Sequence, residues 1–341
     1  MKAIVLEQPG SPAGLRMTDL PTPAPGRGEA LVEVRAAGVC HHDVAIMRGQ
    51  LRRGTKARVV LGHEIAGVVE KIGDDVKNVK PGDRVASILT SACGYCVRCQ
   101  EGREHRCLHG HGLGHGVDGG YAEYVIVSAY SLRLVPESVT FEQAAVCACP
   151  IGVALRAIRD LATPRPGDVA VMTGASGGLG VHAVQILRAF GVRVLAVTGT
   201  AEKIERLQAV GVDEVIFSPD GSFQWEVLAL TSEHGADIIV DTVGSAAFEA
   251  AFASLAQYGR LVMLGEVAGG NVSFNPANVL FKDARIMGST GVSRLDLDQA
   301  LELVRRGLVK PVVTTFPLAA AAKVHQMLMD RQMFGRAVLI P

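Results

Sequence analysis

The 341-residue sequence predicts an α/β protein with two domains, a β-rich domain followed by a doubly wound domain built on a parallel sheet. Three observations lead to this fold class. Strand-like alternation fills residues 1–150, a glycine-rich loop separates an apolar strand from a helix near residue 174, and strands then alternate with helices up to residue 264. A chain of this length also exceeds the usual size of one hydrophobic core.

The first domain, expected over residues 1–150, contains short strands separated by turns. Ala30–Val34 alternates apolar with polar residues, Ile65–Ile72 is rich in Val and Ile, and Tyr121–Val127 follows a Gly-Gly pair. Turns such as the Pro-Gly-Asp sequence at 81–83 divide strands of this kind. These features predict a compact β-rich body.

The second domain, expected over residues 151–290, begins with the short apolar strand Asp168–Met172 and continues through the glycine loop into a helix at Val181–Phe190. The alternation continues with strands at 193–197, 214–217, 237–241 and 260–264 and with helices at 201–209, 223–230 and 246–256. Such alternation predicts a parallel sheet with helices on both faces.

The third segment, residues 291–341, contains a helix-like stretch at Leu297–Arg306 and an apolar strand at Ala337–Ile340. A strand needs a neighbour for its backbone hydrogen bonds, and the first domain is rich in strands. We therefore expect this segment to return to the first domain.

Charge and hydropathy exclude several classes of protein. Lys plus Arg equals Asp plus Glu at 34 each, so the balance gives no reason to expect nucleic acid or an anionic membrane as partner. Glu7 and Pro9 come too early for the apolar centre of a signal peptide, and no uninterrupted apolar run approaches the roughly 20 residues of a membrane helix. We expect a soluble, cytoplasmic protein whose seven cysteines are reduced.

Four cysteines form the strongest single motif, with the spacing Cys93-x2-Cys96-x2-Cys99-x7-Cys107. Four thiolates this close together can surround one zinc and leave no open position, which predicts a structural zinc lobe at about 91–110. A zinc ribbon for nucleic acid usually shows two separated CxxC pairs on a basic surface, whereas this segment is mixed in charge. The favoured interpretation of the histidines at 105, 109, 111 and 115 is exposed turns near this lobe, and the alternatives are that they line the pocket or bind stray metal.

A second set of metal-binding residues is spread along the chain as Cys40, His63 and Cys149. A catalytic zinc usually takes three protein ligands and leaves a fourth position open. Asp43 is expected to accept a hydrogen bond from the His63 nitrogen that faces away from the metal. Glu64 is either a candidate transient ligand or a charge that shapes the electrostatic field at the metal. Taken singly, these residues are also compatible with a buried thiol, a core histidine or a turn.

The glycine loop predicts a dinucleotide site, because glycine lets the backbone approach a pyrophosphate at a helix start. Its candidate residues are Gly174, Ser176, Gly177, Gly178, Leu179 and Gly180. An acidic residue after the next strand would bind the ribose of NAD, but the sequence there is Thr198, Gly199 and Thr200, with Lys203 following. This favours NADP, although NAD stays open because no arginine clamp is evident.

These motifs together resemble those of the zinc-dependent medium-chain alcohol dehydrogenases, over the whole chain. The zinc signature is met by Gly62-His63-Glu64, Gly67, Gly73 and Val76, and Gly119–Tyr124 and Gly335–Leu339 are similar too. The resemblance implies a GroES-like catalytic domain completed by residues 291–341, a Rossmann cofactor domain, and homodimers or homotetramers. It also implies two zinc ions per chain, with Cys40, His63 and Cys149 on the catalytic ion, and a pyrophosphate contact from His41.

The sequence departs from that family at two positions. His42 stands where the family usually has the Ser or Thr that passes on the proton of the alcohol, and Ala45 replaces a relay histidine found in some members. His42 is therefore either the proton acceptor itself or a residue that lines the pocket.

The expected function is hydride transfer between NAD(P) and a primary or secondary alcohol, or the matching aldehyde or ketone. A zinc-independent quinone or enone reductase of the same superfamily and a non-enzymatic structural protein are the alternatives. A further alternative is an anionic alcohol, carboxylate or acyl-CoA, drawn to a basic pocket rim; otherwise that basic segment is a solvated loop. The basic residues are Arg48, Arg52, Arg53, Lys56 and Arg58.

Overall fold

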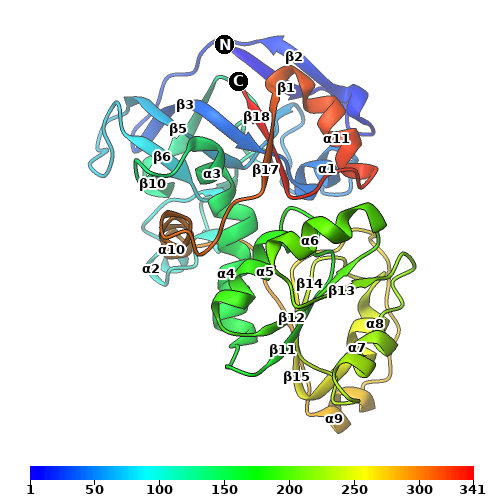
Figure 1. Ribbon diagram of the computed structural model, residues 1–341. Helices are drawn as coiled ribbons and strands as arrows, with labels where there is room; N and C mark the ends of the chain where they lie inside the picture. Colours follow the sequence, from blue (N-terminus) through cyan, green and yellow to red (C-terminus); the bar gives the residue numbers. More distant parts are fainter. The chain divides into compact units, whose positions relative to one another are not determined.

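The computed structural model describes residues 1–341, which form two compact units. The first unit comprises Met1–Gly152, Gly291–Gly307 and Val313–Pro341, and the second comprises Val153–Thr290 and Leu308–Val312 (Figure 1). The first unit is thus assembled from three separate stretches of the chain.

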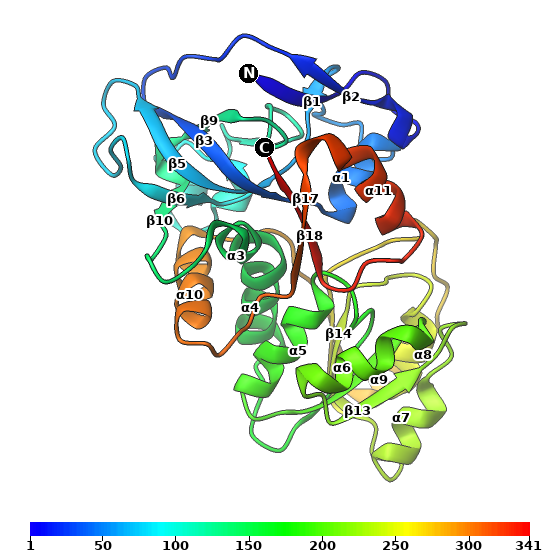
Figure 2. The ribbon, with the colours of Figure 1, turned by 45° about the horizontal axis from the view of Figure 1, so that its top comes forward.

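The largest sheet of the first unit is organised around its longest strand, β3 (Glu29–Gly38). One edge of β3 pairs with β5 (Glu64–Ile72), and the other pairs first with β9 (Tyr124–Ser128) and then with β18 (Arg336–Ile340). β17 (Val313–Pro317) runs parallel to β18. Figure 2 shows these two strands beside β3. Residues close to the end of the sequence therefore complete a sheet that begins at residue 29.

The first unit contains seven further strands, two of which extend this sheet beyond β5, and five α-helices. The strands are β1 (Lys2–Leu6), β2 (Leu15–Asp19), β4 (Val59–Val60), β6 (Arg84–Ser87), β7 (Thr90–Ser91), β8 (His111–Gly112) and β10 (Leu132–Leu134). The helices are α1 (His41–Met47), α2 (Val97–Gln100), α3 (Phe141–Val146), α10 (Arg294–Arg305) and α11 (Ala321–Met329). Val and Ile of β1, β3 and β5 pack with α11 in one core.

The second unit is a six-stranded parallel sheet in the order β13-β12-β11-β14-β15-β16. The strands are β11 (Val169–Met172), β12 (Arg193–Thr198), β13 (Glu214–Phe217), β14 (Ala236–Asp241), β15 (Leu255–Met263) and β16 (Arg285–Gly288). The helices are α4 (Ala154–Arg156), α5 (Gly180–Ala189), α6 (Ile204–Val210), α7 (Gln224–Leu230), α8 (Phe248–Ala253) and α9 (Ala277–Lys282). This is the strand order of a dinucleotide-binding fold, and the predicted fold class is confirmed.

The predicted boundaries were wrong at the junction between α8 and β15. The sequence predicted a helix over 246–256 followed by a strand at 260–264, but α8 ends at Ala253 and β15 already begins at Leu255. Leu255 pairs with Ala236 of β14, so strand pairing overrides the local helical pattern there.

One helical run, Phe141–Ala162, has the length and apolar composition of a membrane-crossing helix. However, 72% of its most apolar window is buried inside the protein, as expected for a core helix of a globular fold. Glu142, Arg156 and Asp160 also interrupt the run with charge.

Candidate metal and catalytic site

Three local structures bring the predicted ligands of the catalytic zinc together in the first unit. Cys40 is the residue before α1, and the Cys40 backbone N–H donates a hydrogen bond to the Asp43 carboxylate at 2.9 Å. His63 lies immediately before β5, at the end of a turn that Gly62 makes with φ +94°. Cys149 lies in a π-helical stretch that contains Pro150, a widened turn of the kind common at functional sites.

The three side chains and Glu64 converge on one point. Their ligand atoms all lie within 4.8 Å of one another, and the Cys40 and Cys149 sulfurs are 3.9 Å apart. Two sulfurs bound to one tetrahedral zinc at about 2.3 Å each would lie about 3.8 Å apart, so the spacing fits a shared ion. His63 and Glu64 are buried, and neither Glu64 oxygen accepts a hydrogen bond. The Arg336 guanidinium lies 3.0 Å from Glu64 Oε1, so this buried carboxylate is paired with a cation of the protein itself.

Asp43 holds the far side of the His63 ring. Its Oδ1 lies 3.0 Å from His63 Nδ1, which directs Nε2 towards the converging ligands. Burial works to raise the pKa of Asp43, but the neighbouring His63 outweighs burial and lowers it. The carboxylate is thus kept ionised, as a group that orients a metal-binding histidine should be.

Arg336 of β18 is a site residue that the sequence reasoning missed. Its guanidinium is buried, lies 3.0 Å from Glu64 Oε1 and 3.7 Å from the Cys149 sulfur, and donates to the Val39 carbonyl at 3.2 Å. Burial raises the pKa of Glu64 to about 7, although Arg336 works in the opposite direction. The pKa of Cys40 is lowered because the Cys149 thiol donates to it, with Arg336 and His63 adding to the effect. An arginine at the start of an apolar strand was the signal available in the sequence.

The four-cysteine motif forms a second cluster, also in the first unit. The sulfur–sulfur distances are 3.9 Å for Cys93 and Cys99, 3.6 Å for Cys96 and Cys99, and 3.8 Å for Cys96 and Cys107. These values again match the edge of a zinc–sulfur tetrahedron and are far longer than a disulfide bond. Backbone N–H groups, first that of Leu108, lower the pKa of Cys96 to about 6. This site has no open corner, because all four positions are sulfur.

Two histidines lie beside the first cluster. The exposed His42 ring is 5.2 Å from the His63 ring and 5.6 Å from the His115 ring, between ring centres. The interpretation of His115 as an exposed turn residue was wrong, because the residue is half-buried and its Nε2 is enclosed without a hydrogen-bond partner. His109 and His111 are exposed, as expected, whereas His105 is half-buried against Gly291. His41 is exposed at the start of α1, and its contact with a pyrophosphate stays a prediction.

The glycine loop of the second unit lies between β11 and α5. Gly174 has φ +60°, and a Cβ there would meet the Thr242 hydroxyl at 2.6 Å, so the chain turns where the ends of β11 and β14 adjoin. A Cβ on Gly180 would meet the Gly174 carbonyl at 2.3 Å, so glycine is needed for α5 to start this close. The backbone N–H groups of Gly178 and Leu179 form no hydrogen bond within the chain. Free N–H groups at a helix start suit a pyrophosphate.

The residues predicted to select the cofactor are partly engaged within the protein. The Thr198 hydroxyl is buried, lies 3.2 Å from the Ser176 hydroxyl and accepts from the Thr200 N–H at 3.3 Å. Lys203 is also buried. Gly199 is exposed and Thr200 is half-buried, which leaves these two as the accessible positions after β12.

Known proteins match both units. The model of the alcohol dehydrogenase GroES-like domain matches residues 26–137, and that of the zinc-binding dehydrogenase matches residues 178–306. Among curated relatives, an acryloyl-coenzyme A reductase of Sulfurisphaera tokodaii is 32% identical over 100% of both chains. An alcohol dehydrogenase of Geobacillus stearothermophilus is 34% identical over 99% of both.

Solved structures give the same result. The crystal structure of AibC is 40% identical with a TM-score of 0.92, covering 100% of this chain and 96% of that one. The alcohol dehydrogenase of Aeropyrum pernix is 29% identical with a TM-score of 0.94, covering 100% of each chain. The resemblance inferred from the motifs is therefore confirmed. The chain belongs to the medium-chain dehydrogenase/reductase family and is an oxidoreductase of that family.

Proposed function

We propose that the protein is a zinc-dependent oxidoreductase that transfers a hydride between NAD(P) and an alcohol, or the matching aldehyde or ketone. The observation that carries this proposal is the convergence of two sulfurs, 3.9 Å apart, with the buried His63 ring and the buried Glu64 carboxylate. A zinc-independent quinone or enone reductase would have no need of this set.

Each residue of the first cluster has a distinct part in the proposal. Cys40, His63 and Cys149 would hold a catalytic zinc, which supplies Lewis-acid polarisation of an oxygen when bound, while the nicotinamide cofactor supplies the hydride chemistry. Two thiolates offset the charge of a divalent ion. Arg336 then balances Glu64, so the buried centre is neutral apart from the hydrogen-bonded Asp43. A carboxylate oxygen of Glu64 lies among the converging ligand atoms, so Glu64 would serve as an occasional ligand on leaving its ion pair with Arg336.

His42 is the residue proposed to move the proton of the alcohol. It is exposed, and its ring lies next to the rings of His63 and His115. An imidazole in this position can take up a proton in place of the hydroxyl that it replaces. The alternative, that His42 only lines the pocket, predicts that His42→Gln changes KM and leaves kcat unaffected.

The test combines metal analysis with one matched pair of variants. Wild-type protein should contain two zinc ions per chain. Cys40→Ser should contain one and lose turnover on a panel of primary and secondary alcohols while still binding nucleotide. Cys147→Ser is the control, because its buried thiol donates to the Gln143 carbonyl outside the cluster. Substantial turnover by Cys40→Ser, or wild-type protein without zinc, would refute the proposal.

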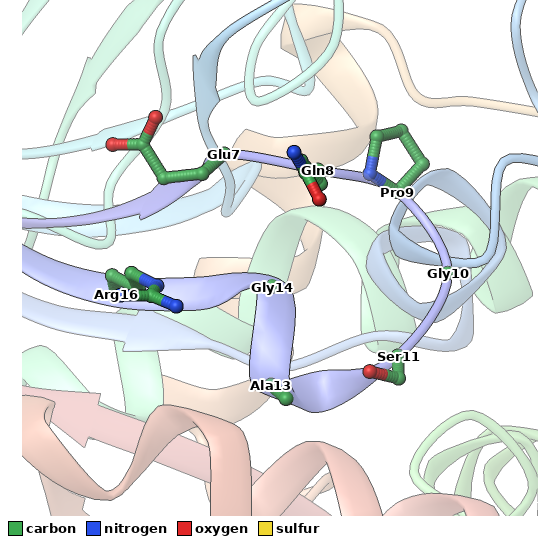
Figure 3. Close-up of a pocket in the computed structure, with 8 residues that line it drawn as sticks. All are labelled: Glu7, Gln8, Pro9, Gly10, Ser11, Ala13, Gly14 and Arg16. Atoms are coloured by element: carbon green, nitrogen blue, oxygen red, sulfur yellow. The ribbon is translucent and has the colours of Figure 1, made fainter.

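A second candidate function is reduction of an acyl-CoA substrate, and two observations favour it. Two curated relatives, from Sulfurisphaera tokodaii and Metallosphaera sedula, are acryloyl-coenzyme A reductases. In addition, a hollow near α1 is lined by Arg52 and Lys56, and it adjoins a larger hollow bordered by Arg16 and shown in Figure 3. Arginine and lysine on an open surface suit the phosphates of coenzyme A.

The basic residues between positions 48 and 58 are only partly paired with acidic side chains. Arg58 pairs with Glu7 and Lys56 with Asp118, whereas Arg48 and Arg53 are exposed and have no ion-pair partner. Turnover of acryloyl-CoA that falls with rising salt, and that Arg53→Glu weakens through KM, would support this candidate. Equal salt dependence for acryloyl-CoA and a neutral alcohol would contradict it.

The finer properties of the protein stay predictions. The preference for NADP is supported by the missing acidic residue at Thr198–Thr200, but Thr198 itself is turned inward. Comparison of kcat/KM with NADP and with NAD tests it directly. A homodimer or homotetramer and a cytoplasmic location are likewise predictions.

A further inference from the structure

The Tyr121 hydroxyl is part of a buried chain of hydrogen bonds that ends on His63. Tyr121 Oη lies 3.0 Å from Asp43 Oδ2, and Asp43 Oδ1 lies 3.0 Å from His63 Nδ1. On its other side, Tyr121 Oη lies 3.4 Å from Nε2 of His325 in α11. Tyr121, Asp43 and His325 are all completely buried. The chain therefore links a C-terminal helix to a residue proposed to bind the catalytic zinc.

The direction of each hydrogen bond follows from the donors available. A carboxylate only accepts, so Asp43 takes its hydrogens from His63 Nδ1, the Cys40 N–H and the Tyr121 hydroxyl. A phenol has one hydrogen, so the contact between Tyr121 and His325 needs a hydrogen on His325 Nε2. His325 Nδ1 is then the bare nitrogen, and it is indeed buried without a partner.

The Tyr121 ring is fixed from several sides. The backbone N–H of Tyr121 donates to the Leu61 carbonyl at 3.0 Å, and the backbone carbonyl of Tyr121 accepts from the Ile4 N–H at 2.8 Å. The ring lies against the backbone of Gly62, where a Cβ would meet Tyr121 Cδ1 at 2.3 Å. His325 meets the ring edge to face, with ring centres 5.9 Å apart. These contacts hold the hydroxyl opposite Asp43 Oδ2.

We propose that Tyr121 and His325 are positioning residues for His63. The Tyr121 hydroxyl holds Asp43 Oδ2 and so turns Oδ1 towards His63 Nδ1, while His325 holds the Tyr121 oxygen. This inference rests on the proposed function, because it takes His63 as a ligand of the catalytic zinc. Loss of the hydroxyl leaves Asp43 Oδ2 with one donor in place of two, the Cys40 N–H, so the carboxylate is held less firmly and the His63 ring can tilt.

The test measures how fast each zinc leaves the protein in the presence of a chelator. Tyr121→Phe keeps the ring and removes only the hydroxyl, and it should speed the release of the catalytic zinc about tenfold, the lower end of the effect typical for groups behind a ligand. The structural zinc held by the four-cysteine cluster is an internal reference and should leave at an unchanged rate. Tyr124→Phe is the matched control, since Tyr124 is half-buried as a residue and its hydroxyl makes no hydrogen bond within the protein.

His325→Phe provides a second variant, which keeps an aromatic ring and removes the hydrogen bond to Tyr121. It should speed the release of the catalytic zinc severalfold, and a cobalt-substituted sample should show a shifted visible spectrum in both variants. Release from Tyr121→Phe at the rate of Tyr124→Phe would overturn the inference. If Tyr121→Phe fails to fold, an unchanged rate in His325→Phe overturns it instead. Wild-type protein with a single zinc would count against the proposed function itself.

Discussion

Replacement of Gly62 by alanine should destabilise the first unit far more than the same change at another glycine with similar backbone angles. Gly62 has φ +94° and faces the Tyr121 ring, whose Cδ1 and Cε1 would lie 2.3 Å and 2.6 Å from a new Cβ. Gly82 has φ +90° in the turn before β6, and nothing lies within 4 Å of a Cβ placed there. The two glycines thus have nearly the same φ, and they differ in whether a new Cβ would clash with a neighbouring side chain.

The size of each effect can be worked from this difference. A left-handed conformation costs alanine about 1–2 kcal/mol relative to glycine. Alanine also has less conformational freedom than glycine in the unfolded chain, which offsets about 0.4–1 kcal/mol of that cost. Gly82→Ala should therefore lower the free energy of unfolding by about 1 kcal/mol. Gly62→Ala adds overpacking against a buried ring that cannot withdraw, which typically costs a further 1–3 kcal/mol.

Urea unfolding of wild-type protein and both variants measures these values, with near-ultraviolet circular dichroism as a probe of tyrosine packing. Gly62→Ala should lose about 2–4 kcal/mol in total and change the tyrosine signal, because the ring must shift. Because Tyr121 also holds Asp43, the catalytic zinc should leave this variant faster than it leaves Gly82→Ala. Equal unfolding free energies for the two variants would refute the reasoning.

Three further predictions concern other parts of the chain. Cys99→Ser should reduce the zinc content from two to one and lower the thermal midpoint, and an unchanged zinc content would count against a structural site. Arg336→Gln should cost about 3–5 kcal/mol by leaving Glu64 buried without its partner, and Glu64→Gln in the same protein should restore part of that loss in a double-mutant cycle; additive losses would contradict this. Burial raises the pKa of Asp241 above its ordinary 3.8, so its contribution is fully present below pH 3.8 and is lost as pH rises through the folded pKa. Wild-type protein should thus lose stability relative to Asp241→Asn as pH rises, whereas a constant difference would exclude the shift.

Much of the second unit could be predicted because its signals are local. The strand expected at Arg193–Val197 is β12, and the one at Glu214–Phe217 coincides with β13, since short apolar runs between turns specify buried parallel strands. The spacing of the four cysteines is equally local. The glycine loop could be placed because a strand precedes it and a helix follows.

The rest depends on contacts between distant residues, which spacing along the chain does not reveal. Tyr121 was expected within a strand, but β9 begins only at Tyr124, and the tyrosine ring turns inward to meet Asp43. His325 lies in α11, a helix that was not predicted although its apolar face packs on the core. Each looks like an ordinary core residue in the sequence, and only the fold shows that both lie behind His63.

The contact between Arg336 and the Val39 carbonyl joins residues 297 positions apart. During synthesis, the segments that carry Cys40, His63 and Cys149 emerge long before Arg336, whose positive charge pairs with the buried Glu64. Contacts of such long range form late, because the intervening chain must first be ordered. A nascent chain would therefore have its four-cysteine cluster in place before the cluster of Cys40, His63 and Cys149 is complete, and zinc at the latter would report that synthesis had reached β18.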